Sequence, residues 1–274
     1  MPDFIRATRN ALEVPVQTWA NDHQTVTLIG MVHLADPRFY TDTAAIIDAL
    51  EDDGCTIYAE GTSYADGATP GIKLLQTLVM HEVFTDLVHQ SIALPRLERW
   101  RNVDLTVEQM LEAAEDPVGM RKLLTSGFPV TDRSATTTIA ALLRPAITPL
   151  LAATAMVVGT GVVKNEATIL TARNQHVMDA VLTAGHDAAL VWGTAHLPGM
   201  GEILTGAGFR LESTSWRPAM AKRRLVDGIR DAVATCRTQS DWPWEGQDVP
   251  ETIPGRNARA LARERGWLTD PVPS

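Results

Sequence analysis

The sequence predicts an α/β fold with a central mixed, largely parallel sheet and an N-terminal hairpin. Two short apolar runs carry this prediction, TVTLIGMVH at 25–33 and AALVWGTAH at 188–196, and each ends in Gly-x-x-His. Apolar runs of this length that are closed by glycine are typical of buried strands. Each is followed by a helical pattern and a further strand-like run, so we expect two related α/β halves around one sheet.

The first half is expected to begin with a hairpin and to continue as a β-α-β unit. Residues 14–19 and 25–29 are strand-like and flank a short polar turn. Asp36 and Pro37 indicate a helix start, and Gly54 indicates its end. The next strand, 55–59, ends at Glu60. Since such a crossover joins parallel strands, His33 and Glu60 should emerge at the same edge of the sheet.

Outside the two α/β halves, the chain is expected to be mainly helical. We expect an α/β domain over residues 1–220, in which 72–163 form a mainly helical insertion, and a helical C-terminal tail over 221–274. Residues 72–94 have the apolar spacing of one amphipathic helix, as do residues 164–182 and a basic stretch that starts at Met220. After His196, a Pro-Gly turn, a short helix and a strand repeat the pattern of the first half.

Residues 139–163 form an unusually apolar segment, and 145–163 carry no charge at all. This length matches a bilayer span, but Pro145 and Pro149 interrupt the segment and Arg144 lies at its edge. A buried helix is therefore favoured over a span. A homo-oligomer interface and a peripheral membrane contact stay open as alternatives.

Composition narrows the class of protein. The chain has 274 residues, a formal net charge of −9 and two cysteines, Cys55 and Cys236, which are far apart. An acidic chain is not expected to bind nucleic acid, because phosphate binding needs a basic face. Two distant cysteines fit a reduced compartment, and the N-terminal stretch lacks the apolar core of a signal peptide, so a cytoplasmic location is expected.

Three polar side chains stand at predicted strand ends: His33, Glu60 and His196. Ligands of open α/β sheets bind outside the carboxyl ends of the strands, which makes this trio a candidate site. Two histidines and a glutamate suit a divalent transition metal with open positions for water. The same trio could work without metal, with one histidine as general base, the glutamate orienting water and the second histidine at the oxyanion.

Several motifs resemble those of the TraB/PrgY/GumN family. They are GMVH at 30–33 followed by ADPRFY, YAEG at 58–61, Arg173-Asn174 with Met178 four residues on, and GTAHLPGM at 193–200. The family is related to the Tiki proteases and, more distantly, to erythromycin esterase. The resemblance implies an α/β fold and, for its Tiki branch, metal-dependent peptide cleavage with Mn or Co. Its bacterial and plasmid members are associated with shutting down peptide pheromone signals.

The resemblance also assigns residues. It implies that His33, Glu60 and His196 hold the metal, with Zn as a further candidate ion, and carry catalysis. Arg173 would orient Glu60 or grip a substrate carboxylate, because its planar fork suits carboxylates. Supporting positions are Gly30, Gly193 and Asp104, the last as a further ligand.

Three functions follow as hypotheses. The first is a metal-dependent, peptidase-like hydrolase of a peptide or small amide. The second is a non-catalytic protein that binds or sequesters a peptide, for which residues 139–163 could supply a groove. The third is a metal-independent esterase.

Overall fold

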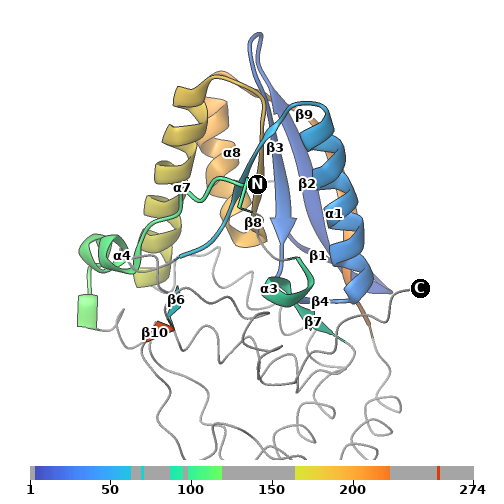
Figure 1. The fold of residues 1–274 in the computed structure, drawn as a ribbon, viewed down its shortest axis with the longest axis horizontal. Coiled ribbons are helices and arrows are strands. Elements are labelled where there is room, and N and C mark those ends of the chain that lie inside the picture. Colours follow the sequence, from blue (N-terminus) through green and yellow to red (C-terminus); the bar gives the residue numbers. More distant parts are fainter. Residues whose placement is uncertain are drawn as a thin grey trace, which may run out of the picture.

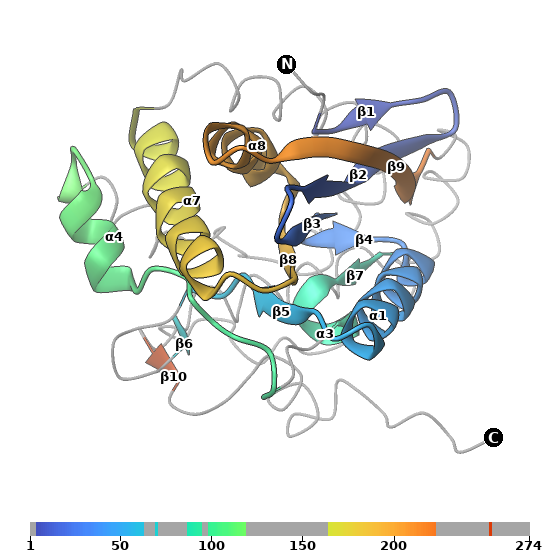
Figure 2. The ribbon, with the colours of Figure 1, turned by 90° about the horizontal axis from the view of Figure 1, so that it is seen from above.

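A six-stranded sheet with helices on both faces forms most of the part of the chain that the structure describes (Figure 1). The structure is a computed structural model and describes residues 4–62, 69–70, 87–94, 98–118, 164–222 and 252–253. Helix α1 (Pro37–Asp52) covers one face of the sheet, and helices α7 (Lys164–Ala184) and α8 (Leu197–Gly206) cover the other (Figure 2).

The sheet is mixed, as the sequence predicts. Its strands are β1 (Arg6–Ala7), β2 (Ala11–Ala20), β3 (Thr25–Met31), β5 (Thr56–Ala59), β8 (Ala188–Gly193) and β9 (Arg210–Ala221). Their order is β1-β2-β3-β8-β5, and β9 also pairs with β2. Strand β2 is antiparallel to β1, β3 and β9, whereas β8 is parallel to both β3 and β5. All described strands of this sheet except β2 therefore run in one direction.

The predicted hairpin and the first crossover are confirmed. Strands β2 and β3 are joined by a turn in which the side-chain oxygen of Asn21 accepts from the main-chain N–H groups of His23 and Gln24. Helix α1 begins at Pro37 and is followed by Gly54 with a positive φ of 86°. Asp36 occupies the N-cap position, but its carboxylate accepts from the N–H of Ala221 in β9 and does not cap the helix.

The two Gly-x-x-His runs are neighbouring parallel strands. Met31 of β3 pairs with Gly193 of β8, so both strands end at the same level. Helix α1 carries the chain from β3 past β8 to β5, and α8 carries it from β8 past β3 and β2 to β9. These crossovers move in opposite directions, and crossovers of one hand then have to lie on opposite faces, as α1 and α8 do (Figure 2).

The alternation of side chains along the strands divides the core into two layers. Val191 and Ala189 of β8 pack with Phe39, Tyr40 and Ile47 of α1. The alternate residues of β8, Leu190 and Trp192, point to the opposite face and pack with α7 and α8. Their cluster also includes Val177, Met178, Val181, Leu197, Met200 and Leu204. A strand that is apolar at every position is thus explained by burial on both faces.

The middle of the chain departs from the sequence-based expectation where it is described. The predicted helix over 72–94 does not extend through its end, because β7 (Val88–His89) pairs with β4 (Leu34–Ala35). Within the described residues 87–94, helix is confined to α3 (Gln90–Ala93). Helix α4 (Val107–Ala113) begins as expected at Thr106, which forms a capping box with Gln109. The helix predicted from Met220 is wrong at its start, since Met220 and Ala221 belong to β9.

Two further expectations lie mainly outside the described residues. The apolar segment 139–163 is not described, and of the tail 221–274 the description beyond Lys222 covers only β10 (Thr252–Ile253), which pairs with β6 (Thr69–Pro70). Among the described helices, none is both long and apolar enough to cross a membrane.

Gly30 provides a test of the close contact at the end of β3. The last pair between β2 and β3 is Val16 with Ile29, and the next residues are Pro15 and Gly30. A Cβ on Gly30 would lie 2.8 Å from the carbonyl oxygen of Pro15 and 3.0 Å from Oγ1 of Thr194. We expect Gly30→Ala to lower the free energy of unfolding by about 1–3 kcal/mol, measured by denaturant titration, because the backbone has to move.

The matched control is Gly206→Ala, since a Cβ at Gly206 meets nothing within 4 Å. That variant should be neutral or up to about 1 kcal/mol more stable, because alanine favours helix. Equal stability of the two variants would show that the backbone at Gly30 tolerates a side chain.

Candidate functional site

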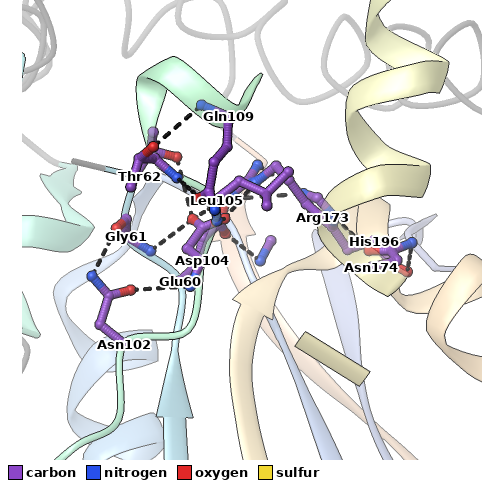
Figure 3. Close-up of polar contacts among 12 residues, drawn as sticks. Glu60, Gly61, Thr62, Asn102, Asp104, Leu105, Gln109, Arg173, Asn174 and His196 are labelled. Atoms are coloured by element: carbon purple, nitrogen blue, oxygen red, sulfur yellow. Dashed lines mark hydrogen bonds and ion pairs between the residues drawn. The ribbon is translucent and has the colours of Figure 1, made fainter. Parts of the chain in front are cut away.

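Four charged or polar side chains converge at the carboxyl end of β5 and β8 (Figure 3). Glu60 directly follows β5, and His196 closes the short helix η1 (Thr194–His196) that follows β8. Asp104 lies in the loop before α4, and Arg173 projects from α7. Of the sequence-predicted site residues, the structure therefore brings together Glu60, Asp104, Arg173 and His196. We call these four residues the Arg173 cluster.

Arg173 is the centre of this cluster. Its Nε donates to Asp104 Oδ1 at 2.8 Å, and Nη2 donates to Asp104 Oδ2 and to Glu60 Oε1, both at 2.6 Å. Nη1 lies 3.1 Å from Nε2 of His196. The fork thus binds one carboxylate with two nitrogens and a second carboxylate with one, a geometry that lysine cannot reproduce.

Both carboxylates are also held by the backbone. Glu60 Oε2 accepts from the N–H of Gly193 at 2.7 Å, and a Cβ on Gly193 would lie 3.0 Å from the same oxygen. Asp104 accepts from the N–H groups of Gly61 and Leu105 and from the hydroxyl of Thr62. Glycine at 193 therefore allows the close approach that fixes Glu60, which explains the glycine of the second motif.

The electrostatic balance of the cluster is negative. Burial alone would raise the pKa of Glu60, but the charge of Arg173, followed by those of His196 and His33 in their protonated forms, holds it well below its usual value. Burial would lower the pKa of Arg173, and Glu60 and Asp104 together raise it above its usual value. Two carboxylates thus face one guanidinium, and the excess negative charge favours a further cation nearby.

His196 is the most enclosed of the functional side chains after Asp104. Its residue is 3% exposed, and its ring packs edge-on against Trp192 with the centroids 6.2 Å apart. Burial lowers the pKa of His196 to about 4, and the attraction of Glu60 only partly opposes this shift. The imidazole is therefore neutral at pH 7.

His33 is placed differently from His196, although the two motifs are alike. It is exposed, it follows β3, and its ring stacks on that of His89 with 5.9 Å between centroids and 4° between planes. Its carbonyl oxygen accepts from the N–H of Gln90 at 2.8 Å. His33 lies near enough to help lower the pKa of Glu60, but no hydrogen bond joins it to the Arg173 cluster among the described residues.

The predicted metal ligands fit a divalent ion in part. Glu60 Oε1 and His196 Nε2 are 3.9 Å apart, and two ligands at about 2.0–2.2 Å from one ion can be separated by that distance. Arg173, however, lies between them and would have to withdraw from Nε2. No group of three or more His, Cys, Asp or Glu within the described ranges is arranged to hold an ion.

Sequence reasoning missed two residues of the site. Asn174 lies 4% exposed beside Arg173 on α7, and its Oδ1 is 2.6 Å from Nδ1 of His196. It stands in the Arg173-Asn174 pair of the sequence motif, which was the available signal. His89 was expected on a helix and lies on β7, where strand pairing brings it beside His33. Nothing in its local sequence predicts this contact.

Comparison of the chain with protein-family models, with curated proteins and with solved structures finds no match. The resemblance to the TraB/PrgY/GumN motifs therefore stays a prediction. The assignment of function depends on the geometry of the site.

The buried imidazole of His196 predicts a specific pH dependence of stability. The pKa of His196 falls from its usual 6.5 to about 4 on folding, so the unfolded chain binds this proton first. The free energy of unfolding should therefore fall as the pH drops below 6.5, by up to about 3 kcal/mol at pH 4. His196→Asn should remove most of this slope between pH 6.5 and 4.5, measured by denaturant titration in a chelating buffer.

His176→Asn is the control, because His176 lies exposed on the same helix as Arg173. It should keep the wild-type slope. A wild-type slope in His196→Asn as well would mean that His196 is not buried as a neutral imidazole.

Proposed function

We propose that the chain is a hydrolase of peptide, small amide or ester bonds, with its site at the carboxyl ends of β3, β5 and β8. One observation carries the proposal. Glu60 forms a buried ion pair with Arg173, which lies 113 residues further along the chain, and Arg173 also contacts the buried His196, all beside the exposed His33. Burying charged groups costs desolvation free energy, and groups with strongly shifted pKa values cluster at functional sites.

Two side chains of the cluster keep part of their surface exposed to solvent. The side chains of Glu60 and Arg173 keep 13% and 11% of their surface exposed, whereas Asp104 is fully buried. Asp104 is therefore a structural partner of Arg173, and the substrate would meet Glu60, Arg173 and the nearby His33.

His33 is the proposed general base. An exposed imidazole within reach of the substrate can take a proton from water as the water attacks. The water oxygen bonds to the substrate carbonyl carbon, and the carbonyl oxygen becomes an oxyanion. When the tetrahedral intermediate breaks down, His33 returns its proton to the leaving amine or alcohol.

Arg173 is the proposed donor to the oxyanion. A guanidinium has five N–H groups, and four of them bind Asp104, Glu60 and His196. The fifth, on Nη1, has no partner among the described residues. A donor that is fixed before the reaction stabilises developing charge without reorganisation, which is the usual source of the largest rate contribution.

A metal-assisted hydrolase is a second proposal, and the 3.9 Å separation of Glu60 Oε1 and His196 Nε2 favours it. Glu60 and His196 would hold the ion, with Mn, Co and Zn as candidates. Such an ion, when bound, polarises a carbonyl and lowers the pKa of bound water.

Turnover by site variants tests the hydrolase. With panels of fluorogenic peptides, anilides and esters in excess, we expect multiple turnover by the wild type. His33→Ala should reduce kcat/KM by about 10²–10⁴, the usual contribution of a general base. Since His33 is exposed, its truncation should leave the fold intact.

The matched control for that loss is His176→Ala, which should keep full activity. Stoichiometric binding of a peptide that is released unchanged after long incubation would point to a binding protein. Unchanged turnover in His33→Ala would exclude His33 as the base.

Chelator treatment distinguishes the two hydrolase proposals. Because Arg173 occupies the space beside His196 Nε2, we expect activity to survive exhaustive treatment with a chelator. About one equivalent of Mn, Co or Zn in the untreated protein, lost in a His196→Ala variant together with the activity, would instead establish the metal-assisted form. Mass spectrometry of metal content is the measurement.

A further inference from the structure

The two ring nitrogens of His196 are contacted by adjacent residues of α7. Arg173 Nη1 lies 3.1 Å from Nε2, and Asn174 Oδ1 lies 2.6 Å from Nδ1. The side-chain amide of Asn174 makes a second contact with the same residue, because its Nδ2 donates to the main-chain oxygen of His196 at 3.2 Å. Asn174 thus forms hydrogen bonds with both the ring and the main chain of His196 (Figure 3).

These contacts allow a single protonation pattern of the ring. A guanidinium only donates, so Nε2 has to be the acceptor and carries no proton. A neutral imidazole then has its proton on Nδ1, and Asn174 Oδ1 is the acceptor for it. The opposite tautomer would place two N–H groups against each other at 3.1 Å and two lone pairs against each other at 2.6 Å.

The orientation of the Asn174 amide is itself fixed. Nδ2 has to face the main-chain oxygen of His196, which accepts and cannot donate. Helix α8 also packs closely here, since a Cβ on Gly199 would lie 2.5 Å from Nδ2. With the amide held in this way, Oδ1 faces Nδ1 and the amide cannot rotate without losing both bonds.

We infer that Asn174 is a positioning residue for His196: its Oδ1 accepts a hydrogen bond from Nδ1–H and keeps the lone pair of Nε2 turned toward Arg173 and Glu60. This role deepens the proposed hydrolase and rests on it for its value in catalysis. An Nε2 lone pair of fixed direction holds Nη1 of Arg173, the proposed oxyanion donor, and is also what a metal ligand requires. A partner on Nδ1 is the usual means of fixing that direction. The sequence motif contains both Arg173 and Asn174 but gave a role to Arg173 alone. The contacts of Asn174 with His196 give it a role as well.

The tautomer is measurable without a substrate. We would label the seven histidines with ¹⁵N, assign His196 by the signal that is lost in His196→Gln, and record ring nitrogen shifts at pH 7.5 in a chelating buffer. In the wild type we expect Nδ1 to have the shift of a protonated nitrogen and Nε2 that of an unprotonated one. The Nδ1 proton should exchange slowly with solvent, because the residue is buried.

Two variants of similar size separate positioning from packing. Asn174→Leu removes the acceptor, so the slowly exchanging Nδ1–H signal should be lost. Asn174→Asp keeps an acceptor and should retain the signal, shifted downfield because the hydrogen bond becomes charge-assisted. A proton on Nε2 in the wild type, or an unchanged Nδ1–H signal in Asn174→Leu, would overturn the inference.

Turnover forms a separate readout. If the proposed function is correct, Asn174→Leu should lower kcat more than it raises KM, and Asn174→Asp should restore part of kcat. A protein with the expected tautomer but without turnover of any substrate would refute the hydrolase and leave the role of Asn174 in place. Full kcat in Asn174→Leu, with the tautomer lost, would refute the catalytic value of the positioning.

Discussion

The guanidinium of Arg173 is the interaction on which the arrangement of the site depends. It joins Asp104, Glu60 and His196, which come from the loop before α4, the end of β5 and the turn after β8. Without this cation, two carboxylates would lie buried with no balancing charge, and burial of an unpaired charge costs several kcal/mol. The ion pairs therefore join α7 to the edge of the sheet, in addition to its apolar packing, and they define the charges at that edge.

The same four-residue motif produces two different histidines. After Gly30 the chain enters β4, which pairs with β7, and His33 stays at the surface beside His89. After Gly193 the chain turns into η1 and α8 beside α7, and His196 is enclosed by Asn174, Arg173 and Trp192. A motif can thus place an imidazole at a strand end, while the next element decides whether that imidazole is accessible or fixed.

Periodicity and turn residues predicted the parts of the fold that depend on local sequence. The hairpin, α1, α7 and the parallel runs before His33 and His196 are present, because their apolar spacing and their glycines act over a few residues. The position of β8 between β3 and β5 could not be read from any local pattern. Nor could the bond from Arg173 to Asp104, which spans 69 residues, or the strand at His89, where pairing with β4 overrides helical spacing.

The position of β8 also has a consequence for how the chain folds. Val26 pairs with Ala188, and Ala188 also registers with Thr56, so the central parallel strand comes from a segment far along the chain. Topologies dominated by such distant pairings have high contact order and fold slowly. The entropy of closing a long loop is lost before strand pairing contributes any stabilising free energy. Before β8 is in place, β3 and β5 each have an unpaired apolar edge. Such edges are sites of aggregation in newly synthesised chains.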